Sequence, residues 1–246
     1  MKAYGLIGYP LTHSFSKQYF TEKIEREGIA DAVFYSFPLT QIDELPDLLK
    51  DNPQLKGLAV TIPYKEQVLK YVDVLSDEVK HIGAANCIRI RNNKLTAYNT
   101  DIIGFERSFA KKLNPSHNKA LILGTGGSSK AVQYVLEKLE IEFLVVSRNE
   151  HGDENSIQYD QLSEAIINEY RIIINTTPLG MSPVEDTCPD LPYGLLSNDH
   201  YLYDLVYVPA KTLFLQKGEQ QGATIENGFE MLIIQAEENW RIWNED

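Results

Sequence analysis

The chain has 246 residues, and its 35 acidic side chains outnumber its 23 basic ones to give a net charge of −12. A nucleic-acid-binding protein needs a basic surface that displaces counterions from phosphates, so the composition argues against a nucleic-acid partner. Hydrophobic residues make up 43% of the sequence, enough for one large domain or two smaller ones. The charge is uneven: residues 1–100 hold 12 basic and 12 acidic side chains, and residues 101–246 carry the whole net charge.

The compartment follows from what the sequence lacks. The two cysteines, Cys87 and Cys188, are too few for a disulfide framework and form no Cys-x-x-Cys pair. Residues 1–10 lack the apolar core of a signal peptide, and no apolar run approaches the roughly 18–20 residues of a membrane span. We therefore expect a cytoplasmic protein with no membrane partner.

The first part of the chain alternates strand and helix patterns. Strands are predicted at residues 2–8, 32–37, 57–61, 86–90 and 95–98, and helices at 15–27, 41–50 and from Pro63 through Lys65 to Tyr71. The last two strands flank a polar turn at 91–94 and form a β-hairpin. This order predicts an α/β domain with a mixed sheet.

Residues 101–246 follow a more regular pattern. Asp101 is predicted to cap a helix that runs to Leu113, and the turn-forming residues 114–118 then mark a domain boundary. Strands are predicted at 119–123, 143–146, 171–175 and 201–206, and helices at 128–139, 161–168, 211–221 and 229–244. A run of strand–helix units predicts a Rossmann-type, doubly wound parallel sheet with helices on both faces.

A glycine-rich loop joins the first strand and helix of this second region. It consists of Gly124, Thr125, Gly126, Gly127 and Ser128. Glycines there permit a tight turn and let the backbone approach a pyrophosphate at the positive end of the helix. A turn that merely connects two elements is the alternative. Because strand, loop, helix and next strand all follow in order, we favour a dinucleotide site.

The next strand ends in Ser147 and Arg148. An acidic residue at this point would accept the ribose hydroxyls of NAD, whereas an arginine can pair with the 2′-phosphate of NADP. Arg148 therefore favours NADP, although Glu150 nearby keeps NAD open and a solvated surface arginine is the alternative.

Two features of the first region suggest a substrate site, and each has a purely structural alternative. Ser14 and Ser16 at a helix start could hold a carboxylate, yet serines also cap helices routinely. Lys65 is placed in the first turn of a predicted helix, where the helix dipole disfavours a cation. With Asp101 and Asn86 it could form a proton donor for a carbonyl group, or it could be a surface lysine beside a simple cap.

No metal site is expected. The five histidines are scattered, without a His-x-x-x-His pair or a neighbouring acidic cluster. A Gly-x-Ser-x-Gly nucleophile motif is also absent.

Taken together, these residues resemble the shikimate dehydrogenase family over nearly the whole chain. Each motif alone is weak, but their joint occurrence in the family's order is specific. The segments are Ser14 and Ser16, residues 60–65 (Val-Thr-Ile-Pro-Tyr-Lys), 83–86 (Gly-Ala-Ala-Asn), 99–101 (Asn-Thr-Asp), 124–128, 175–181 (Asn-Thr-Thr-Pro-Leu-Gly-Met), 204–209 (Asp-Leu-Val-Tyr-Val-Pro), 227–232 (Asn-Gly-Phe-Glu-Met-Leu) and Gln235.

The resemblance implies reversible reduction of 3-dehydroshikimate to shikimate by NADPH, a step of the shikimate pathway to chorismate and the aromatic amino acids. It implies that Lys65 and Asp101 form the catalytic pair. The substrate residues it implies are Ser14, Ser16 and Tyr207 for the carboxylate and Thr61, Asn86, Asp101 and Gln235 for the ring hydroxyls. The cofactor residues it implies are Gly124, Thr125, Gly126, Gly127 and Ser128 for the pyrophosphate, Ser147 and Arg148 for the adenosine phosphate, and Leu205 and Gly228 for the nicotinamide.

The resemblance also implies how the chain is divided into domains. Residues 1–113 would form the substrate-binding and catalytic domain, and residues 114–228 the NADP-binding domain. Because Gln235 lies on the last helix, residues 229–246 would return to the first domain. The protein would be a monomer or a homodimer.

One departure from the family leaves alternatives open. The family often reads Asn-Arg-Thr where this chain has Ser147, Arg148 and Asn149, so the threonine's phosphate contact is lost or replaced. A paralogue that oxidises quinate or shikimate with NAD is one alternative. A catalytically inactive, ligand-sensing relative is the other.

Overall fold

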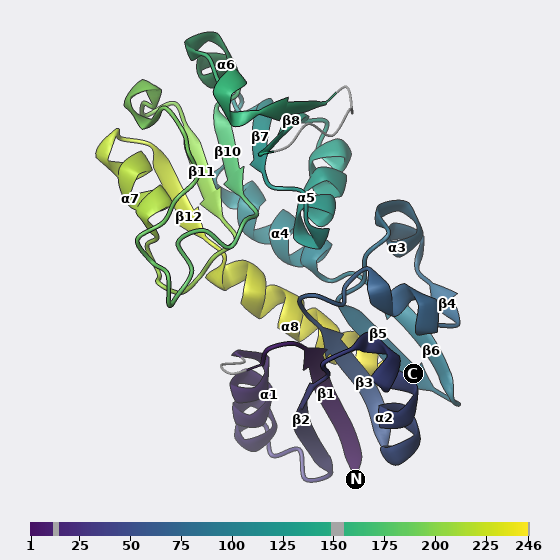
Figure 1. The fold of residues 1–246 in the computed structure, drawn as a ribbon. Helices are drawn as coiled ribbons and strands as arrows, with labels where there is room; N and C mark the ends of the chain where they lie inside the picture. Colours follow the sequence, from purple (N-terminus) through teal and green to yellow (C-terminus); the bar gives the residue numbers. More distant parts are fainter. Residues whose placement is uncertain (12–14, 149–154, 246) are drawn as a thin grey trace. The chain divides into compact units, whose positions relative to one another are not determined.

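The computed structural model describes residues 1–11, 15–148 and 155–245 of the chain. These residues form two compact units (Figure 1). Unit 1 consists of residues 1–100 and 235–246, and unit 2 of residues 101–234. Within the described ranges, none of the helices is long and apolar enough to cross a membrane.

Unit 1 contains a six-stranded sheet in the order β2-β1-β3-β5-β6-β4. Its strands are β1 (Lys2–Gly8), β2 (Ala32–Pro38), β3 (Leu55–Val60), β4 (Val74–Leu75), β5 (Cys87–Arg91) and β6 (Lys94–Tyr98). Strand β1 pairs in parallel with β2 and β3, whereas β5 runs antiparallel to β3 and β6, so the predicted mixed sheet is confirmed. Asn92 and Asn93 both adopt positive φ at the β5–β6 turn, as a two-residue hairpin of this hand requires.

The helices of unit 1 differ from the prediction in three places, of which the first two are an altered start of α2 and an additional helix. They are α1 (Phe15–Arg26), α2 (Leu45–Asp51), α3 (Asp77–Ile82) and the second half of α8 (Phe229–Asn244). A 3-10 turn at Ile42–Glu44 precedes α2, so Pro46 lies in the first turn of that helix, where proline is tolerated. Helix α3, with the Ser76 hydroxyl accepting from the Val79 N–H, was not predicted.

The helix predicted from Pro63 does not form, and this expectation was wrong. Only a 3-10 helix at Gln67–Tyr71 follows, and Lys65 lies in a turn before it. The reason is a competing partner: the Lys65 carbonyl accepts a hydrogen bond from the Ala85 N–H at 2.8 Å, outside any helical ladder. The helix-dipole argument for Lys65 therefore falls away.

The C-terminal half of α8 is packed into unit 1, which confirms the predicted return of this helix. The Trp243 ring stacks on Tyr4 at 5.3 Å between ring centroids and lies 5.2 Å from Phe20. A side chain on Gly57 of β3 would collide with Trp243, because its Cβ would lie 2.2 Å from the indole. Close approach of α8 to the sheet therefore depends on this glycine.

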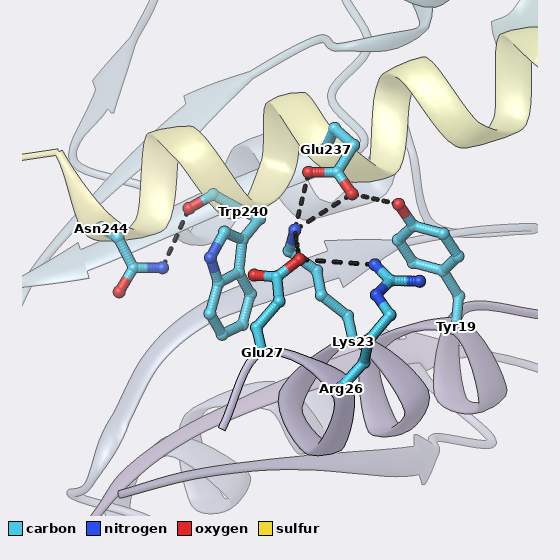
Figure 2. A network of polar contacts seen from close by, with 7 residues as sticks. All are labelled: Tyr19, Lys23, Arg26, Glu27, Glu237, Trp240 and Asn244. Carbon is cyan, nitrogen blue, oxygen red and sulfur yellow. Dashed lines mark hydrogen bonds and ion pairs between the residues drawn. The ribbon is translucent and has the colours of Figure 1, made fainter. Parts of the chain in front are cut away.

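A charged network also attaches α8 to α1 (Figure 2). The ammonium of Lys23, whose residue is 5% exposed, donates to Glu237 on α8 at 2.8 Å and to Glu27 at 2.8 Å. The Tyr19 hydroxyl donates to Glu237 as well. Burial disfavours the ammonium, but its hydrogen bonds outweigh burial and raise the pKa of Lys23.

Unit 2 contains an all-parallel, six-stranded sheet in the order β12-β11-β10-β7-β8-β9, which confirms the predicted Rossmann-type architecture. Its strands are β7 (Lys119–Leu123), β8 (Glu142–Ser147), β9 (Ser156–Gln158), β10 (Ile172–Asn175), β11 (Tyr201–Asp204) and β12 (Thr224–Asn227). Its helices are α4 (Asp101–Phe109), α5 (Gly127–Lys138), α6 (Glu164–Glu169), α7 (Leu213–Gln220) and the first half of α8. The short outer strands β9 and β12 were not predicted.

The boundaries of the two units differ from those of the two predicted domains at both places where the chain crosses between them. The prediction placed the first boundary at 113 and the second at 228, whereas the units change at 100 and 234. Helix α4 belongs to unit 2 because it packs on α5 and buries two aromatic rings there. Phe105 meets Tyr203 of β11 edge to face, and Phe109 stacks on Tyr201.

Candidate active site

Unit 1 places three of the predicted catalytic and substrate residues near one another. Lys65 is half-buried, and its carbonyl accepts from the N–H of Ala85, the residue before Asn86. The Asn86 side chain is 3% exposed and donates to the Gln235 side chain on α8 at 3.2 Å. Residues that are 149 positions apart in sequence are therefore neighbours.

The backbone of Asn86 is held on both sides. Its N–H donates to the Tyr98 carbonyl at 3.1 Å, and its own carbonyl accepts from the Val60 N–H at 2.8 Å. Thr61 follows Val60 directly at the end of β3, and its N–H donates to the Ile7 carbonyl of β1. The positions of Thr61 and Asn86 are thus fixed by ordinary sheet hydrogen bonds.

Two residues that the sequence reasoning did not single out belong to the same cluster. Thr100 and Asn239 are each 1% exposed, and the Thr100 hydroxyl donates to the Asn239 side chain at 2.8 Å. Asn239 also donates to Gln235 at 3.4 Å. One signal was available in the sequence, because Asn239 lies four positions after Gln235 and so shares its face of α8.

The remaining predicted substrate residues are placed less fully. Ser16 is half-buried in the first turn of α1, and Ser14 lies outside the described residues. Asp101 is 6% exposed and is the first residue of α4 rather than the residue before it. Tyr207 of unit 2 is half-buried, and burial raises the pKa of its hydroxyl.

The glycine-rich loop of unit 2 lies at the topological switch point of the sheet, between β7 and β10. Gly124 has φ +108°, and a Cβ there would lie 2.9 Å from the Thr176 hydroxyl that follows β10. Gly126 caps α5 in an extended conformation, and a Cβ on it would meet open space. Thr125 is exposed, and Gly127 and Ser128 begin α5, so the loop opens directly into the N-terminus of a 12-residue helix.

Ser129 occupies the position of a third glycine in the usual dinucleotide loop. Its side chain is fully buried, and its hydroxyl accepts a hydrogen bond from Gln133 at 3.1 Å. The helix therefore tolerates a serine where it meets the sheet, because the hydroxyl has a partner within the same helix.

Strand β8 ends at Ser147, and Arg148 follows it at the same edge of the sheet. Ser147 is buried and Arg148 is exposed. Strand β9 pairs with β8 so that Gln158 lies beside Ser147. Asn149 and Glu150, which bear on the choice of cofactor, lie outside the described residues.

A buried carboxylate organises the ends of β10 and β11. Asp204 is fully buried, and it accepts from the Asn175 amide at 2.9 Å, the Val206 N–H at 3.0 Å and the Thr212 hydroxyl at 2.5 Å. Burial raises the pKa of Asp204 to about 6, although all three hydrogen bonds act in the opposite direction. The sequence motif contained this aspartate, but its structural role was not predicted.

The two segments expected at the nicotinamide are in direct contact. A Cβ on buried Gly228 would lie 2.2 Å from the Leu205 carbonyl oxygen, so only glycine lets the backbone after β12 approach the backbone after β11 so closely. Across residues 1–11, 15–148 and 155–245, no group of three or more His, Cys, Asp or Glu side chains could hold a metal ion.

Comparisons with known proteins agree with this architecture. The family model for the shikimate dehydrogenase substrate binding domain matches residues 6–88. The shikimate dehydrogenase (NADP(+)) of Methanococcus maripaludis is 36% identical over 258 residues, which cover 98% of this chain and 91% of that protein. The structure of the Thermus thermophilus shikimate 5-dehydrogenase in complex with NADP(H) and shikimate has a TM-score of 0.87 and 27% identity, with 99% of this chain and 94% of that chain covered.

A second similar structure is the quinate dehydrogenase of Corynebacterium glutamicum in complex with NAD. It has a TM-score of 0.86 and 26% identity, with 99% of this chain and 93% of that chain covered. The mixed α/β unit followed by a Rossmann-type unit is thus the architecture of a two-domain dehydrogenase. The chain belongs to the shikimate dehydrogenase family, and the resemblance of its motifs is confirmed.

Proposed function

We propose that this protein is an NADP-dependent shikimate dehydrogenase, which reversibly reduces 3-dehydroshikimate to shikimate in the pathway to chorismate and the aromatic amino acids. The observation that carries the proposal is the cluster in unit 1: the Lys65 carbonyl accepts from the Ala85 N–H, and the side chain of the next residue, Asn86, donates to Gln235. These residues belong to three separate motifs of the sequence, which were expected to supply a catalytic lysine and two substrate contacts. Most of the proposed substrate residues lie in unit 1, and unit 2 would bind the nucleotide.

Lys65 is proposed as the acid that acts on the substrate carbonyl. As hydride reaches the carbonyl carbon, negative charge develops on the oxygen, and an ammonium both stabilises that charge and supplies the proton. In the oxidative direction the neutral amine takes the hydroxyl proton back. Asp101 would orient Lys65 and bind a neighbouring hydroxyl.

The other proposed substrate contacts divide by ligand group. Asn86, Thr61 and Gln235 would bind the ring hydroxyls, and their amide and hydroxyl groups suit neutral oxygen partners. Ser14, Ser16 and Tyr207 would hold the carboxylate, since each offers an O–H donor.

Unit 2 fits a dinucleotide at the loop after β7. The φ of Gly124 and the open space over Gly126 leave the backbone N–H groups of the loop accessible at the N-terminus of α5, where an anionic pyrophosphate is stabilised. When bound, NADPH supplies the hydride. Leu205 and Gly228, which are in backbone contact, would position the nicotinamide.

Arg148 and Ser147 would bind the adenosine phosphate, and this contact is our reason for choosing NADP over NAD. Arg148 is exposed at the end of β8, so its guanidinium is available to pair with a 2′-phosphate. No charge of this kind is needed for NAD.

The deciding experiment is a steady-state assay of the full-length protein with NADP and NAD, each on shikimate and on quinate. We expect the highest kcat/KM for shikimate with NADP. A preference for quinate with NAD would establish the paralogue, and no turnover of either substrate would establish a ligand-sensing relative. Either result would overturn the proposed function.

A further inference from the structure

The orientation of the Asn86 amide is set by the backbone. The Thr100 N–H, which can only donate, points at one end of the Asn86 side chain from 2.7 Å. That end must therefore be the oxygen, Oδ1. The opposite end is then the NH₂ group, and this group faces Gln235.

The orientation of the Asn86 amide in turn fixes the orientation of the Gln235 amide. Because Asn86 presents an NH₂ group to it at 3.2 Å, the facing atom of Gln235 must be the acceptor Oε1. The reversed orientation of the Gln235 amide would direct N–H groups at another N–H donor. Among the described residues, the hydrogen bonds of the Gln235 side chain all end on Oε1, and Nε2 has no protein partner.

Asn239 completes the arrangement from within α8. Its Oδ1 accepts from the Thr100 hydroxyl at 2.8 Å, and its NH₂ group donates to Oε1 of Gln235 at 3.4 Å. Asn239 is 1% exposed and lies one helical turn after Gln235. It therefore cannot reach solvent, and its hydrogen bonds go to the residues that define the site.

We propose that Asn239 is a positioning residue for the substrate site: with Asn86 it holds the side-chain oxygen of Gln235, so that Gln235 presents its NH₂ group to a substrate hydroxyl oxygen. The inference rests on the proposed function, because it assumes that Gln235 contacts the substrate. It adds a direction to that contact. The hydroxyl accepts from Gln235, which leaves the hydroxyl proton to be donated elsewhere.

The physical gain is pre-organisation. A half-buried glutamine with an unrestrained amide would present oxygen and nitrogen to the ligand in turn, and binding would have to select one orientation. Two donors on Oε1 impose that choice before the substrate arrives, which lowers the cost of ordering the side chain on binding.

The test uses steady-state kinetics of the full-length protein with shikimate and NADP. Gln235→Ala measures the contact itself. Asn239→Leu removes both hydrogen bonds of Asn239 and keeps the same branched arrangement of side-chain heavy atoms. Asn239→Asp keeps the shape and the acceptor for Thr100 but cannot donate to Gln235, and it keeps the inference testable if the leucine variant does not fold.

We expect Gln235→Ala to raise the KM for shikimate ~10-fold, the equivalent of one hydrogen bond of ~1.4 kcal/mol. Asn239→Leu and Asn239→Asp should each raise it ~3- to 10-fold, while kcat and the KM for NADP stay within ~2-fold. In the Gln235→Ala background, either change at 239 should have no further effect on the KM, because its only route to the substrate is then missing.

Several results would overturn the inference. An unchanged KM in both Asn239 variants would show that Asn86 alone suffices. Equal losses with and without Gln235 would show that Asn239 acts on packing instead. If the wild-type protein turns over shikimate but Gln235→Ala leaves the KM unchanged, the assumed contact is wrong, whereas an inactive wild-type protein refutes the proposed function itself.

Discussion

The network that attaches α8 to α1 can be tested through Lys23→Met, which keeps the aliphatic stem and removes the ammonium (Figure 2). Three hydrogen bonds are lost: to Glu27 at 2.8 Å and to the two oxygens of Glu237 at 2.8 and 3.1 Å. The Lys23 side chain is only 6% exposed, so methionine suits its surroundings. The cost arises from the two carboxylates that lose their partner.

The solvent exposure of the Glu27 and Glu237 carboxylates determines how much stability Lys23→Met costs. Breaking a fully buried ion pair costs ~3–5 kcal/mol, whereas an exposed pair contributes ~0.2–1 kcal/mol. The side chains of Glu27 and Glu237 are 39% and 44% exposed, so water can replace much of what they lose. We therefore expect Lys23→Met to lower the free energy of unfolding of unit 1 by ~1–2 kcal/mol.

The assay is urea denaturation followed by tryptophan fluorescence. Both tryptophans, Trp240 and Trp243, lie in the part of α8 that belongs to unit 1, so their emission reports the unit that contains the network. The double variant Lys23→Met with Glu237→Gln completes a double-mutant cycle, and we expect a coupling energy of ~1 kcal/mol.

Lys80→Met is the matched control. Lys80 pairs with Asp77 at 2.7 Å, but these side chains are 59% and 95% exposed, so the expected change is below ~0.5 kcal/mol. If Lys23→Met were no more destabilising than this control, or if the cycle gave no coupling, the network would not hold α8 and our reasoning from burial would be refuted.

Three further predictions concern the proposed site and the buried carboxylate. Lys65→Ala should lower kcat ~10²–10⁴-fold with a much smaller change in the KM for shikimate, and near-normal kcat would end the catalytic assignment. Arg148→Ala should weaken NADP binding by ~1.5–3 kcal/mol and leave NAD binding nearly unchanged, as measured by KM for each cofactor; equal losses would make Arg148 structural. Burial raises the pKa of Asp204 to about 6, so between pH 4 and 6 the folded state holds a proton that the unfolded state has released. The stability that this carboxyl contributes is thus present below pH ~4 and lost as the pH rises through ~6, by ~3 kcal/mol in all. Asp204→Asn should remove this slope in urea denaturation at a series of pH values, and parallel pH profiles for the two proteins would contradict it.

Local patterns in the sequence predicted most elements of the fold. These patterns are the alternation of apolar residues, the glycine-rich loop and the order of strands and helices. They depend on interactions between near neighbours along the chain, so the sequence predicted both sheets and the doubly wound unit. The strands that were missed are short: β4 has two residues, β9 three and β12 four. Segments of that length carry too little periodicity and form because a neighbouring strand offers hydrogen-bonding partners.

The tertiary structure decided the site. The sequence predicts a helix at Lys65. In the structure its carbonyl instead accepts a hydrogen bond from the N–H of Ala85, twenty residues further on, and Lys65 lies in a turn. Asn239 reads as an ordinary polar position on an amphipathic helix, yet it is buried against Thr100 and Gln235. Motifs could indicate which residue types meet the substrate, because their chemistry is a property of each residue. Their partners and orientations come from hydrogen bonds between segments that lie 14 to 149 residues apart, and only the folded chain brings those segments together.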